Sequence, residues 1–444
     1  MKGFNNTRRA LLATSAAVAM LAAAACSSGS DNEGGPGPLP TDDVTLTMWW
    51  WGNEDRAKLQ QDAIDAFEAK YPYIHIKGEP QVFDGYFDAL GTRFAADDAP
   101  DLFTLGGAYP KSYGTDELLL DLSAENVSQE IDLSTFSDGI LASARVDDKI
   151  FGVPTGGNTI AVLANPALFK QAGVDLPDDD AWTWDDFADL ANELSDKLPD
   201  GYYGAEIRPW DVLGAYAGQR SPLYTDDDLA VDASVLEDFF QLEKDLADSG
   251  ASLPAGLAVE TQGAQAAQTL FGQGKAAMIF SYANQIGTYA NAAGNPADGT
   301  DDAVLLRLPG ETEFDNPGTT LLPSQYFAAS ATTPYPRQAA LFLDFLVNDP
   351  AAAKILGTNR GIPSSSKALA GVTADLSGYD KASFEFMTDM NSKFGATFVP
   401  PAWATQLEPI TKGIESEVLN GQITPAQGAQ QWIDKMKDTQ EAAS

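Results

Sequence analysis

Histidine and cysteine, two side chains that serve many catalytic devices, each occur only once in this chain, as His75 and Cys26. A Ser-His-Asp or Cys-His device needs a histidine next to the nucleophile, and His75 lies on a segment with strand character. Zinc sites built from histidine and cysteine need several such ligands, so the sequence excludes them. It also has no G-x-S-x-G elbow and no G-x-x-x-x-G-K-[ST] phosphate loop. Neither a catalytic constellation nor a cofactor is therefore expected.

Carboxylates are the abundant reactive group, with 64 aspartates and glutamates in the chain. The runs at 178–180 and 226–228 lack the spacing of a calcium loop and are typical of solvated loops. A glycoside hydrolase needs only two well-placed carboxylates, so that class stays open as an alternative. The glycines of 272–277 superficially match a dinucleotide-binding motif, but this segment leads into a strand instead of opening a helix.

Alternating strands and helices must position whatever site the chain builds. Periodicity and breaker residues predict, in order, strand 44–51, helix 54–71, strand 74–77, helix 83–95 and strand 100–105. This order is typical of an α/β fold with a parallel sheet. Ligands of such sheets lie beyond the carboxyl ends of the strands, which here are residues 50–53 and 106–109.

Strands and helices continue to alternate along the rest of the chain. The full length of 444 residues predicts two lobes or domains. The glycine-rich segment 155–158 indicates a bend or a close backbone approach. The predicted elements are strand 149–154, strand 160–163, helices 184–194, 234–247 and 264–271, strand 276–280, and helices 337–347, 414–420 and 425–439.

The N-terminus has the layout of a secretory signal peptide, with Lys2, Arg8 and Arg9 before an apolar stretch at 11–25. The small residues that lead into Cys26 resemble a bacterial lipobox, although alanine replaces the usual leucine three positions earlier. The resemblance implies cleavage after residue 25 and lipidation of Cys26. The alternative is an ordinary signal peptide followed by an incidental cysteine.

Residues 26–41 are rich in Gly, Pro and Ser and are predicted to form a flexible tether behind the lipidated cysteine. Such an anchor would hold the exported protein on the outer face of the cytoplasmic membrane. Arg8-Arg9 also resembles a twin-arginine signal, so Sec and twin-arginine export both stay open.

The formal net charge is −37, and loss of the basic leader would make the mature chain more negative still. Such a surface repels nucleic acid, so no nucleic-acid partner is expected. The charge is typical of a solubility adaptation, and it also makes an anionic ligand less expected than a neutral or cationic one.

Several short motifs follow one another along the body of the chain. They are MWWWGN at 48–53, FEAKYP at 67–72, APDL at 99–102, GVP at 152–154 with Asn165, Leu168, Phe169 and Gly173, TWDDF at 183–187, GKAAM at 274–278 and RGIP at 360–363. In order and spacing they resemble the extracellular solute-binding proteins of sugar-type ABC importers, the maltodextrin-binding-protein-like group. The resemblance runs from about Val44 to the end of the chain. It departs from the family pattern at Ala164, where a tyrosine is usual.

The resemblance implies an α/β fold of two lobes, each a mostly parallel sheet flanked by helices, joined by hinge strands. Lobe one would comprise 42–155 and 325–366, and lobe two 157–322 and 367–444, with crossings near 155–158, 322–325 and 364–367. Ligand would close the lobes, and ABC permease subunits would recognise the closed, monomeric protein. The implied function is capture of a sugar without catalysis.

Sugar binding needs flat aromatic faces and polar groups for the hydroxyls. Trp50, Trp51 and Tyr109 follow predicted strands, whereas the resemblance places the other candidates. These are Asn53, Glu54, Asn158, Trp210, Tyr282, Asn284 and Trp403. Core packing or helix capping is the alternative for each of them, and neighbours on a strand face opposite sides, so at least one of the adjacent tryptophans is expected in the core. Trp182, Trp184 and Trp432 are expected in the core, and Arg360 is expected to hold its turn, with a place in the cleft as the alternative. Other solutes, such as a polyamine, remain an alternative ligand class.

Overall fold

The computed structural model describes residues 37–225, 228–292, 303–374, 376–390 and 400–442, without the side chains of 209–211. The chain divides into one unit of residues 1–37 and a second of residues 38–444. The predicted signal peptide and the lipidation site at Cys26 lie outside the described residues, as does most of the predicted tether. Among the residues described, no helix is both long and apolar enough to cross a bilayer.

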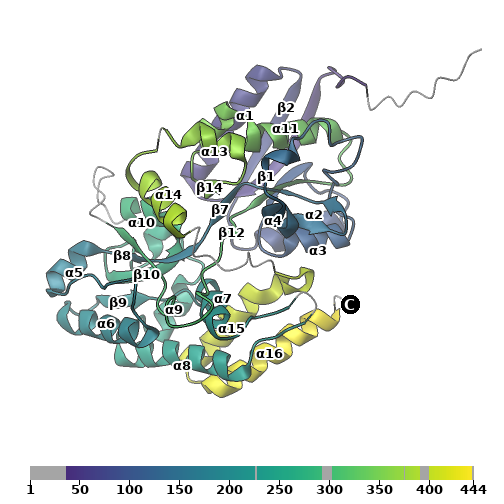
Figure 1. Cartoon of the computed structure of the whole chain (residues 1–444). Coiled ribbons are helices and arrows are strands. Elements are labelled where there is room, and N and C mark those ends of the chain that lie inside the picture. The colour runs from purple at the N-terminus through teal and green to yellow at the C-terminus, as the bar shows by residue number, and fades with distance from the viewer. Residues whose placement is uncertain (1–36, 226–227, 293–302, 375, 391–399, 443–444) are drawn as a thin grey trace, which may run out of the picture. The chain divides into compact units, whose positions relative to one another are not determined.

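One lobe is built on a five-stranded sheet in the order β2-β1-β3-β13-β6 (Figure 1). Its elements are β1 (Val44–Trp51), α1 (Glu54–Lys70), β2 (Ile74–Gln81), α2 (Tyr86–Ala95), β3 (Leu102–Leu105), α3 (Tyr109–Thr115), α4 (Asp138–Leu141), β4 (Arg145–Val146), β5 (Lys149–Ile150), β6 (Val153–Pro154), β13 (Tyr326–Ala329), α11 (Pro336–Asn348), α12 (Pro350–Leu356) and α13 (Ser366–Val372), with 3₁₀ turns at Leu133–Thr135 and Ala142–Ala144. Strand β1 is parallel to β2 and β3, whereas β13 is antiparallel to β3 and β6.

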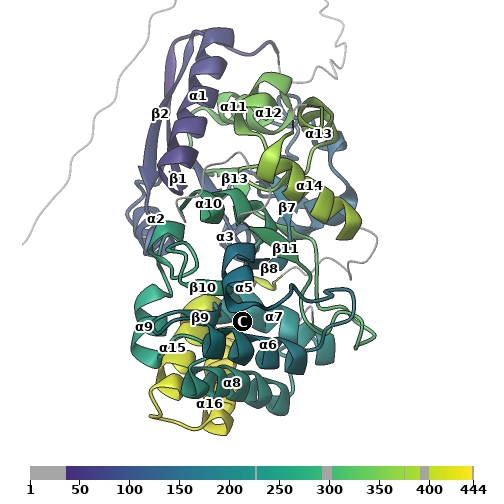
Figure 2. The same cartoon turned by 90° about the vertical axis from the view of Figure 1, so that its left-hand side faces the viewer.

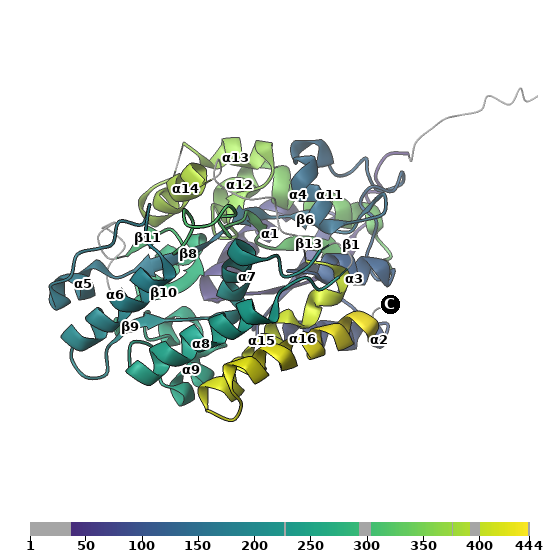
Figure 3. The ribbon, with the colours of Figure 1, turned by 60° about the horizontal axis from the view of Figure 1, so that its bottom comes forward.

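The other lobe is built on a four-stranded sheet in the order β11-β8-β10-β9, with α15 and α16 packed beside α8 (Figure 3). Its elements are β8 (Ile160–Ala164), α5 (Pro166–Ala172), α6 (Trp184–Lys197), β9 (Tyr203–Glu206), α7 (Pro209–Arg220), α8 (Ala233–Ser249), α9 (Ala255–Thr261), β10 (Ala276–Tyr282), α10 (Ile286–Ala292), β11 (Val304–Leu306), α14 (Gly378–Met390), α15 (Leu407–Leu419) and α16 (Pro425–Ala442), with 3₁₀ turns at Ala266–Gln268, Ala283–Gln285 and Ala402–Gln406. Strand β10 is parallel to β9 and antiparallel to β8.

These two sheets confirm the predicted two-lobe α/β fold but correct one detail. Both sheets are mixed, whereas mostly parallel sheets were predicted. In the first lobe the reason is β13, which enters from the other lobe and runs back along β3 in the opposite direction. Predicted helix 264–271 is also wrong, because its residues form only the 3₁₀ turn Ala266–Gln268 before a loop.

A small three-stranded sheet, in the order β12-β7-β14, lies between the two lobes (Figure 1). Its strands are β7 (Gly156–Asn158), β12 (Leu322–Pro323) and β14 (Ile362–Pro363). A Cβ on Gly156 would lie 2.4 Å from the carbonyl oxygen of Arg360, and Gly361 has a φ of +88°. Only glycine fits such a close backbone approach and such a dihedral angle. The glycines expected to mark a bend therefore allow the strands to cross here.

Helices α1, α11 and α12 lie beside the sheet of the first lobe (Figure 2), and their apolar side chains join those of the sheet in one core cluster. Phe67 of α1 lies edge-on to Phe342 and Phe345 of α11, with ring centroids 4.7 and 5.3 Å apart. In the second lobe, Trp184 and Trp432 are buried, as predicted. Burial of these large rings stabilises each lobe, because each ring removes a wide apolar area from water.

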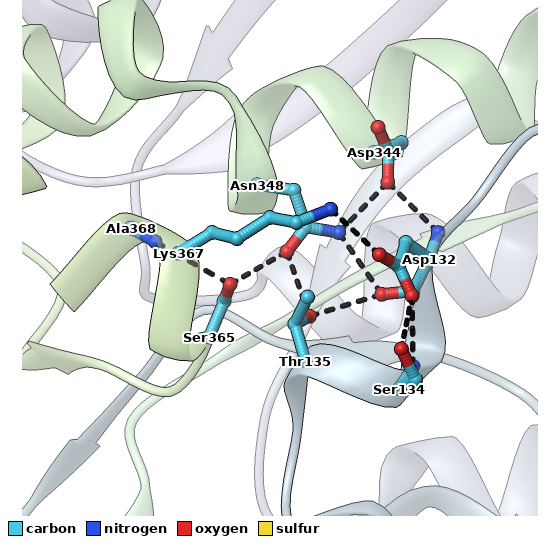
Figure 4. A network of polar contacts seen from close by, with 8 residues as sticks. All are labelled: Asp132, Ser134, Thr135, Asp344, Asn348, Ser365, Lys367 and Ala368. Atoms are coloured by element: carbon cyan, nitrogen blue, oxygen red, sulfur yellow. Dashed lines mark hydrogen bonds and ion pairs between the residues drawn. The ribbon is translucent and has the colours of Figure 1, made fainter. Parts of the chain in front are cut away.

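A polar cluster fixes α13 to the first lobe (Figure 4). The Asn348 side-chain oxygen accepts hydrogen bonds from Thr135 at 2.8 Å and Ser365 at 2.6 Å. Lys367 donates to the Asp132 carboxylate at 2.6 Å. The predicted lobe boundaries remain a prediction, and these contacts favour a last boundary that lies after α13 instead of at residue 366.

Candidate ligand-binding site

A cavity of about 530 Å³ lies where the two lobes and the three-stranded sheet meet. Trp51 and Tyr109 line it from the first lobe, Tyr282 and Gln262 from the second, and Asn158 from the small sheet. This volume is within the range of small-molecule sites, and sites of this kind combine an apolar lining with a few polar groups. The carboxyl ends of β1 and β3 contribute to the wall, as expected for an open α/β sheet.

One side of the cavity is an aromatic wall formed by Trp51, Phe83, Phe87 and Tyr109. The Trp51 ring lies 5.7 Å from Phe83 and 5.4 Å from Phe87, in tilted and edge-on orientations. Phe87 and Tyr109 are stacked, with centroids 3.7 Å apart and planes 6° from parallel. Burial raises the pKa of the Tyr109 hydroxyl, so the ring is neutral at physiological pH. Neutral aromatic faces suit the C–H face of a pyranose.

The tryptophans of β1 alternate in the way a strand dictates, and this corrects one candidate. Trp51 faces the cavity, whereas Trp50 points to the opposite face and is 1% exposed in the core of the first lobe. The Trp50 ring covers Gly78 of β2, where any Cβ would lie 2.7 Å from the indole. Trp49 shares the face of Trp51 and donates from its indole nitrogen to Glu79 at 2.9 Å.

A chain of hydrogen bonds, the polar chain, connects the small sheet to both lobes. The Asn158 side-chain nitrogen donates to the Asn284 side-chain oxygen at 2.5 Å. Asn284 in turn donates to the carbonyl oxygen of Asn359 at 3.0 Å. Arg56 of α1 donates to the same carbonyl oxygen at 3.1 Å and to the Asn359 side chain at 2.9 Å. All four residues line the cavity, so the predicted Asn158 and Asn284 lie together there.

Asn53 is the N-cap of α1, since its side chain accepts from the backbone N–H of Arg56 at 2.9 Å. This bond stabilises the first turn of the helix and also fixes the Asn53 side chain at the cavity rim. Both roles anticipated for Asn53, helix cap and cavity residue, are therefore compatible. Glu54 is exposed and does not line the cavity, because the helix turns its side chain away.

The second lobe contributes a more polar wall. Arg208 donates to the Tyr289 hydroxyl at 3.2 Å and to the carbonyl oxygen of Gln262 at 3.0 Å. Lys412 pairs with Glu408 one turn earlier on α15, at 2.5 Å. Tyr282, at the end of β10, is half-buried at the cavity. These groups provide hydrogen-bond donors and acceptors opposite the aromatic wall.

One further candidate, Trp403, is not brought to the cavity wall. Trp403 is 9% exposed in the core of the second lobe and lies edge-on to Tyr224, with centroids 5.6 Å apart. The adjacent Ala404 and Thr405 line the cavity in its place. Trp210 belongs to the first turn of α7, but its side chain lies outside the described residues.

Sequence reasoning missed several residues of the cavity. Phe83 and Phe87 are separated by one helical turn, and that spacing is equally typical of a core stripe. Arg208 and Gln262 carry no local motif. Asn359 precedes the RGIP turn, which was the only available signal near it.

The match to known proteins agrees with this geometry. Residues 50–353 match the family described as bacterial extracellular solute-binding protein. The chain is similar to the multiple sugar-binding protein of Streptococcus mutans, with 26% identity over 39% of each chain. It is also similar to the galactooligosaccharide-binding protein of Bacillus subtilis, with 24% identity over 55% of this chain and 57% of the relative. The similarity therefore spans well under two thirds of each of these relatives.

Solved structures match over more of their length. An extracellular solute-binding protein family 1 from Alicyclobacillus acidocaldarius has a TM-score of 0.62 and 27% identity, covering 90% of this chain and 99% of that one. A periplasmic oligogalacturonide-binding protein from Yersinia enterocolitica, in complex with saturated digalacturonic acid, has a TM-score of 0.79 and 21% identity. It covers 90% of this chain and 100% of its own. At that identity the second match supports the fold alone.

Proposed function

Because the chain belongs to the bacterial extracellular solute-binding protein family, we propose that it captures a carbohydrate in the cavity between its lobes for an ABC importer. The observation that carries the proposal is the pairing of the aromatic wall with the polar chain across one cavity of about 530 Å³. The two similar proteins that are named for binding multiple sugars and galactooligosaccharide support the same ligand class.

The aromatic wall and the polar chain would contact different parts of a sugar. The stacked rings of Phe87 and Tyr109 give a rigid apolar surface at low entropic cost. The amides of Asn158 and Asn284, already oriented by their mutual hydrogen bond, offer donors and acceptors to hydroxyl groups. Preorganised groups of this kind lose little freedom when a ligand binds, and so increase affinity.

Ligand binding would close the two lobes by a movement about the three-stranded sheet. Ligand contacts from both lobes stabilise the closed arrangement over an open one, and the difference in affinity sets the shift in population. The crossing strands β7, β12 and β14 are the positions where a change in backbone angles could swing one lobe. The permease subunits would bind the closed, monomeric form.

We assign the chain no catalytic role. Among the described residues there is no cluster of His, Cys, Asp and Glu that could hold a metal ion. Among the described residues, the charged side chains that line the cavity include one carboxylate, Glu408, which is paired with Lys412. A glycoside hydrolase needs two carboxyl groups beside the scissile bond. The lipid anchor on Cys26 and the location on the outer membrane face belong to the same proposal.

A thermal-shift screen of the mature chain tests the function. Neutral and acidic mono- and oligosaccharides are compared with spermidine and amino acids, since a ligand that binds only the folded state raises the melting temperature. We expect a saccharide to raise it in the wild type and to lose most of its effect in Tyr109→Ala. Tyr73→Ala, an aromatic substitution outside the cavity, serves as the control. A shift with spermidine but with no saccharide would reject the sugar assignment.

A further inference from the structure

The cavity carries a charge opposite to that of the protein around it. The chain as a whole has a formal charge of −37. The charged side chains that line the cavity, among the described residues, are Arg56, Arg208, Arg360, Lys412 and Glu408. Since Glu408 and Lys412 pair with each other, Arg56 and Arg360 leave a positive excess among the described side chains. The positive charge at this site favours an anionic group on the ligand, although the negative surface around it repels anions at a distance.

Arg56 and Arg360 are the central pair of this site. Arg56 is 9% exposed, and the hydrogen bonds of its guanidinium go to the neutral oxygens of Asn359. Burial lowers the pKa of Arg56 to about 10. No carboxylate among the described residues forms an ion pair with either arginine. The Arg56 charge is therefore buried and has no counter-charge within the part of the chain that the structure describes.

Arg360 is buried more deeply still, with 4% of its surface exposed. Its three guanidinium nitrogens have no hydrogen-bond partner among the described residues. The guanidinium carbon lies 5.4 Å from the centre of the Phe327 ring, a contact that attracts a cation but satisfies none of its N–H groups. Burial, together with the nearby charge of Arg56, lowers the pKa of Arg360 well below its usual value. Arg360 lines the interlobe cavity and also a void of about 30 Å³ next to it, which is large enough for one water molecule.

Two adjacent buried cations are unfavourable unless something supplies the opposite charge. The turn expected to need Arg360 for support receives no hydrogen bond from its side chain. The first turn of α1 adds its own partial positive charge near Arg56, while Glu54 and Asp55 of that turn are exposed and do not line the cavity. Among the described residues, the guanidinium nitrogens of Arg360 therefore lack an acceptor, which an anionic ligand could supply.

We propose that the ligand is an anionic carbohydrate, whose carboxylate or phosphate binds at Arg56 and Arg360 next to the aromatic wall. The inference rests on the proposed function and narrows its substrate class. It replaces the expectation of a neutral or cationic ligand, which rested on net charge alone. Guanidinium groups suit both anions, because their paired N–H groups match the oxygens of a carboxylate or phosphate.

Calorimetric titration of the mature chain with matched ligands tests the inference. The probes are galacturonic acid oligomers, the corresponding neutral galactose oligomers and galactose 6-phosphate. We expect an acidic sugar to bind at least tenfold more tightly than its neutral counterpart and to weaken as salt is raised. Preference for the uronic acids or for the phosphate ester identifies which anion is bound.

Two arginine variants locate the charge. Arg360→Met keeps a similar volume and removes the buried cation, so it should fold with equal or greater thermal stability. It should lose at least tenfold in affinity for the acidic sugar and retain any weak binding of the neutral one. Arg93→Met, at an exposed arginine of the same lobe, is the control and should change neither.

The outcomes separate the two proposals. A neutral sugar that binds as tightly as its acidic counterpart, with no salt dependence, overturns the anionic ligand and leaves sugar capture intact. Absence of binding by every saccharide overturns the proposed function itself. If Arg360→Met does not fold, the ratio of acidic to neutral affinity in the wild type and its salt dependence still decide the question.

Discussion

A pair of buried carboxyl groups behind the cavity makes stability depend on pH. Glu243 of α8 is 3% exposed and neither of its carboxyl oxygens has a hydrogen-bond partner among the described residues. Glu415 of α15 is 2% exposed and accepts a hydrogen bond from Gln262, which lines the cavity. Burial, and then the nearby charge of Glu415, raises the pKa of Glu243 well above its usual range. Burial raises the pKa of Glu415 as well.

The sign of the effect follows from where the protons are lost. In the unfolded chain a glutamate releases its proton near pH 4.3, whereas the folded protein keeps it to higher pH. The contribution of this pair to stability is therefore greatest below the unfolded pKa and falls as the pH rises through the neutral range. Each proton kept only by the folded state costs about 1.4 kcal/mol per pH unit, or ~2.7 kcal/mol between pH 6 and 8.

We expect Glu243→Gln to remove most of this dependence for one group. Urea unfolding at pH 6, 7 and 8 should give the variant a shallower decline in the free energy of unfolding than the wild type, by at most about 1.4 kcal/mol per pH unit. Glu237→Gln, at an exposed glutamate on the same helix, should leave the decline unchanged. Parallel declines in wild type and Glu243→Gln would refute the reasoning.

Three further substitutions probe other parts of the account. Thr183→Ala removes the capping box that Thr183 forms with Asp186, and should lower the free energy of urea unfolding by about 1 kcal/mol; unchanged stability would contradict the cap. Gly361→Ala places a Cβ 2.3 Å from a carbonyl oxygen of β7 at a φ of +88° and should lower the melting temperature, whereas Gly139→Ala, where a Cβ meets no atom within 4 Å, should not. Asn284→Ala breaks the polar chain and should lower the affinity for the carbohydrate by about tenfold in calorimetry, a loss typical of one hydrogen bond. An unchanged affinity would show that Asn284 does not contribute to the site.

Local chemistry made much of the fold predictable. Pro72 and the T-W-D-D-F segment at 183–187 fix helix ends through backbone and capping chemistry, and the structure places helix boundaries there. The long amphipathic helices α8, α11 and α16 were predicted within a few residues at each end. The direction of β13 was not predictable in this way. It depends on a crossing from the other lobe, and no local pattern encodes such a crossing.

The candidate site, too, could be predicted only in part from local sequence patterns. Strand periodicity dictates that Trp50 and Trp51 face opposite sides, but it does not say which side carries the core. Trp403 and Phe87 illustrate the same limit, since an aromatic in a helix or turn has the same pattern whether it packs inside or lines a cavity. Asn158 was placed by resemblance, and its position beside Asn284 arises only from folding.

Hydrogen–deuterium exchange with and without the carbohydrate found in the screen tests the central claim most directly. The cavity between the lobes predicts that ligand slows exchange at residues 51–53, 106–109 and 282–285, which come from separate parts of the sequence and meet only at this site. The exposed face of α16 should exchange at the same rate in both conditions. Saturating ligand that leaves all three segments unprotected, or that protects only a surface remote from them, would contradict carbohydrate capture between the lobes.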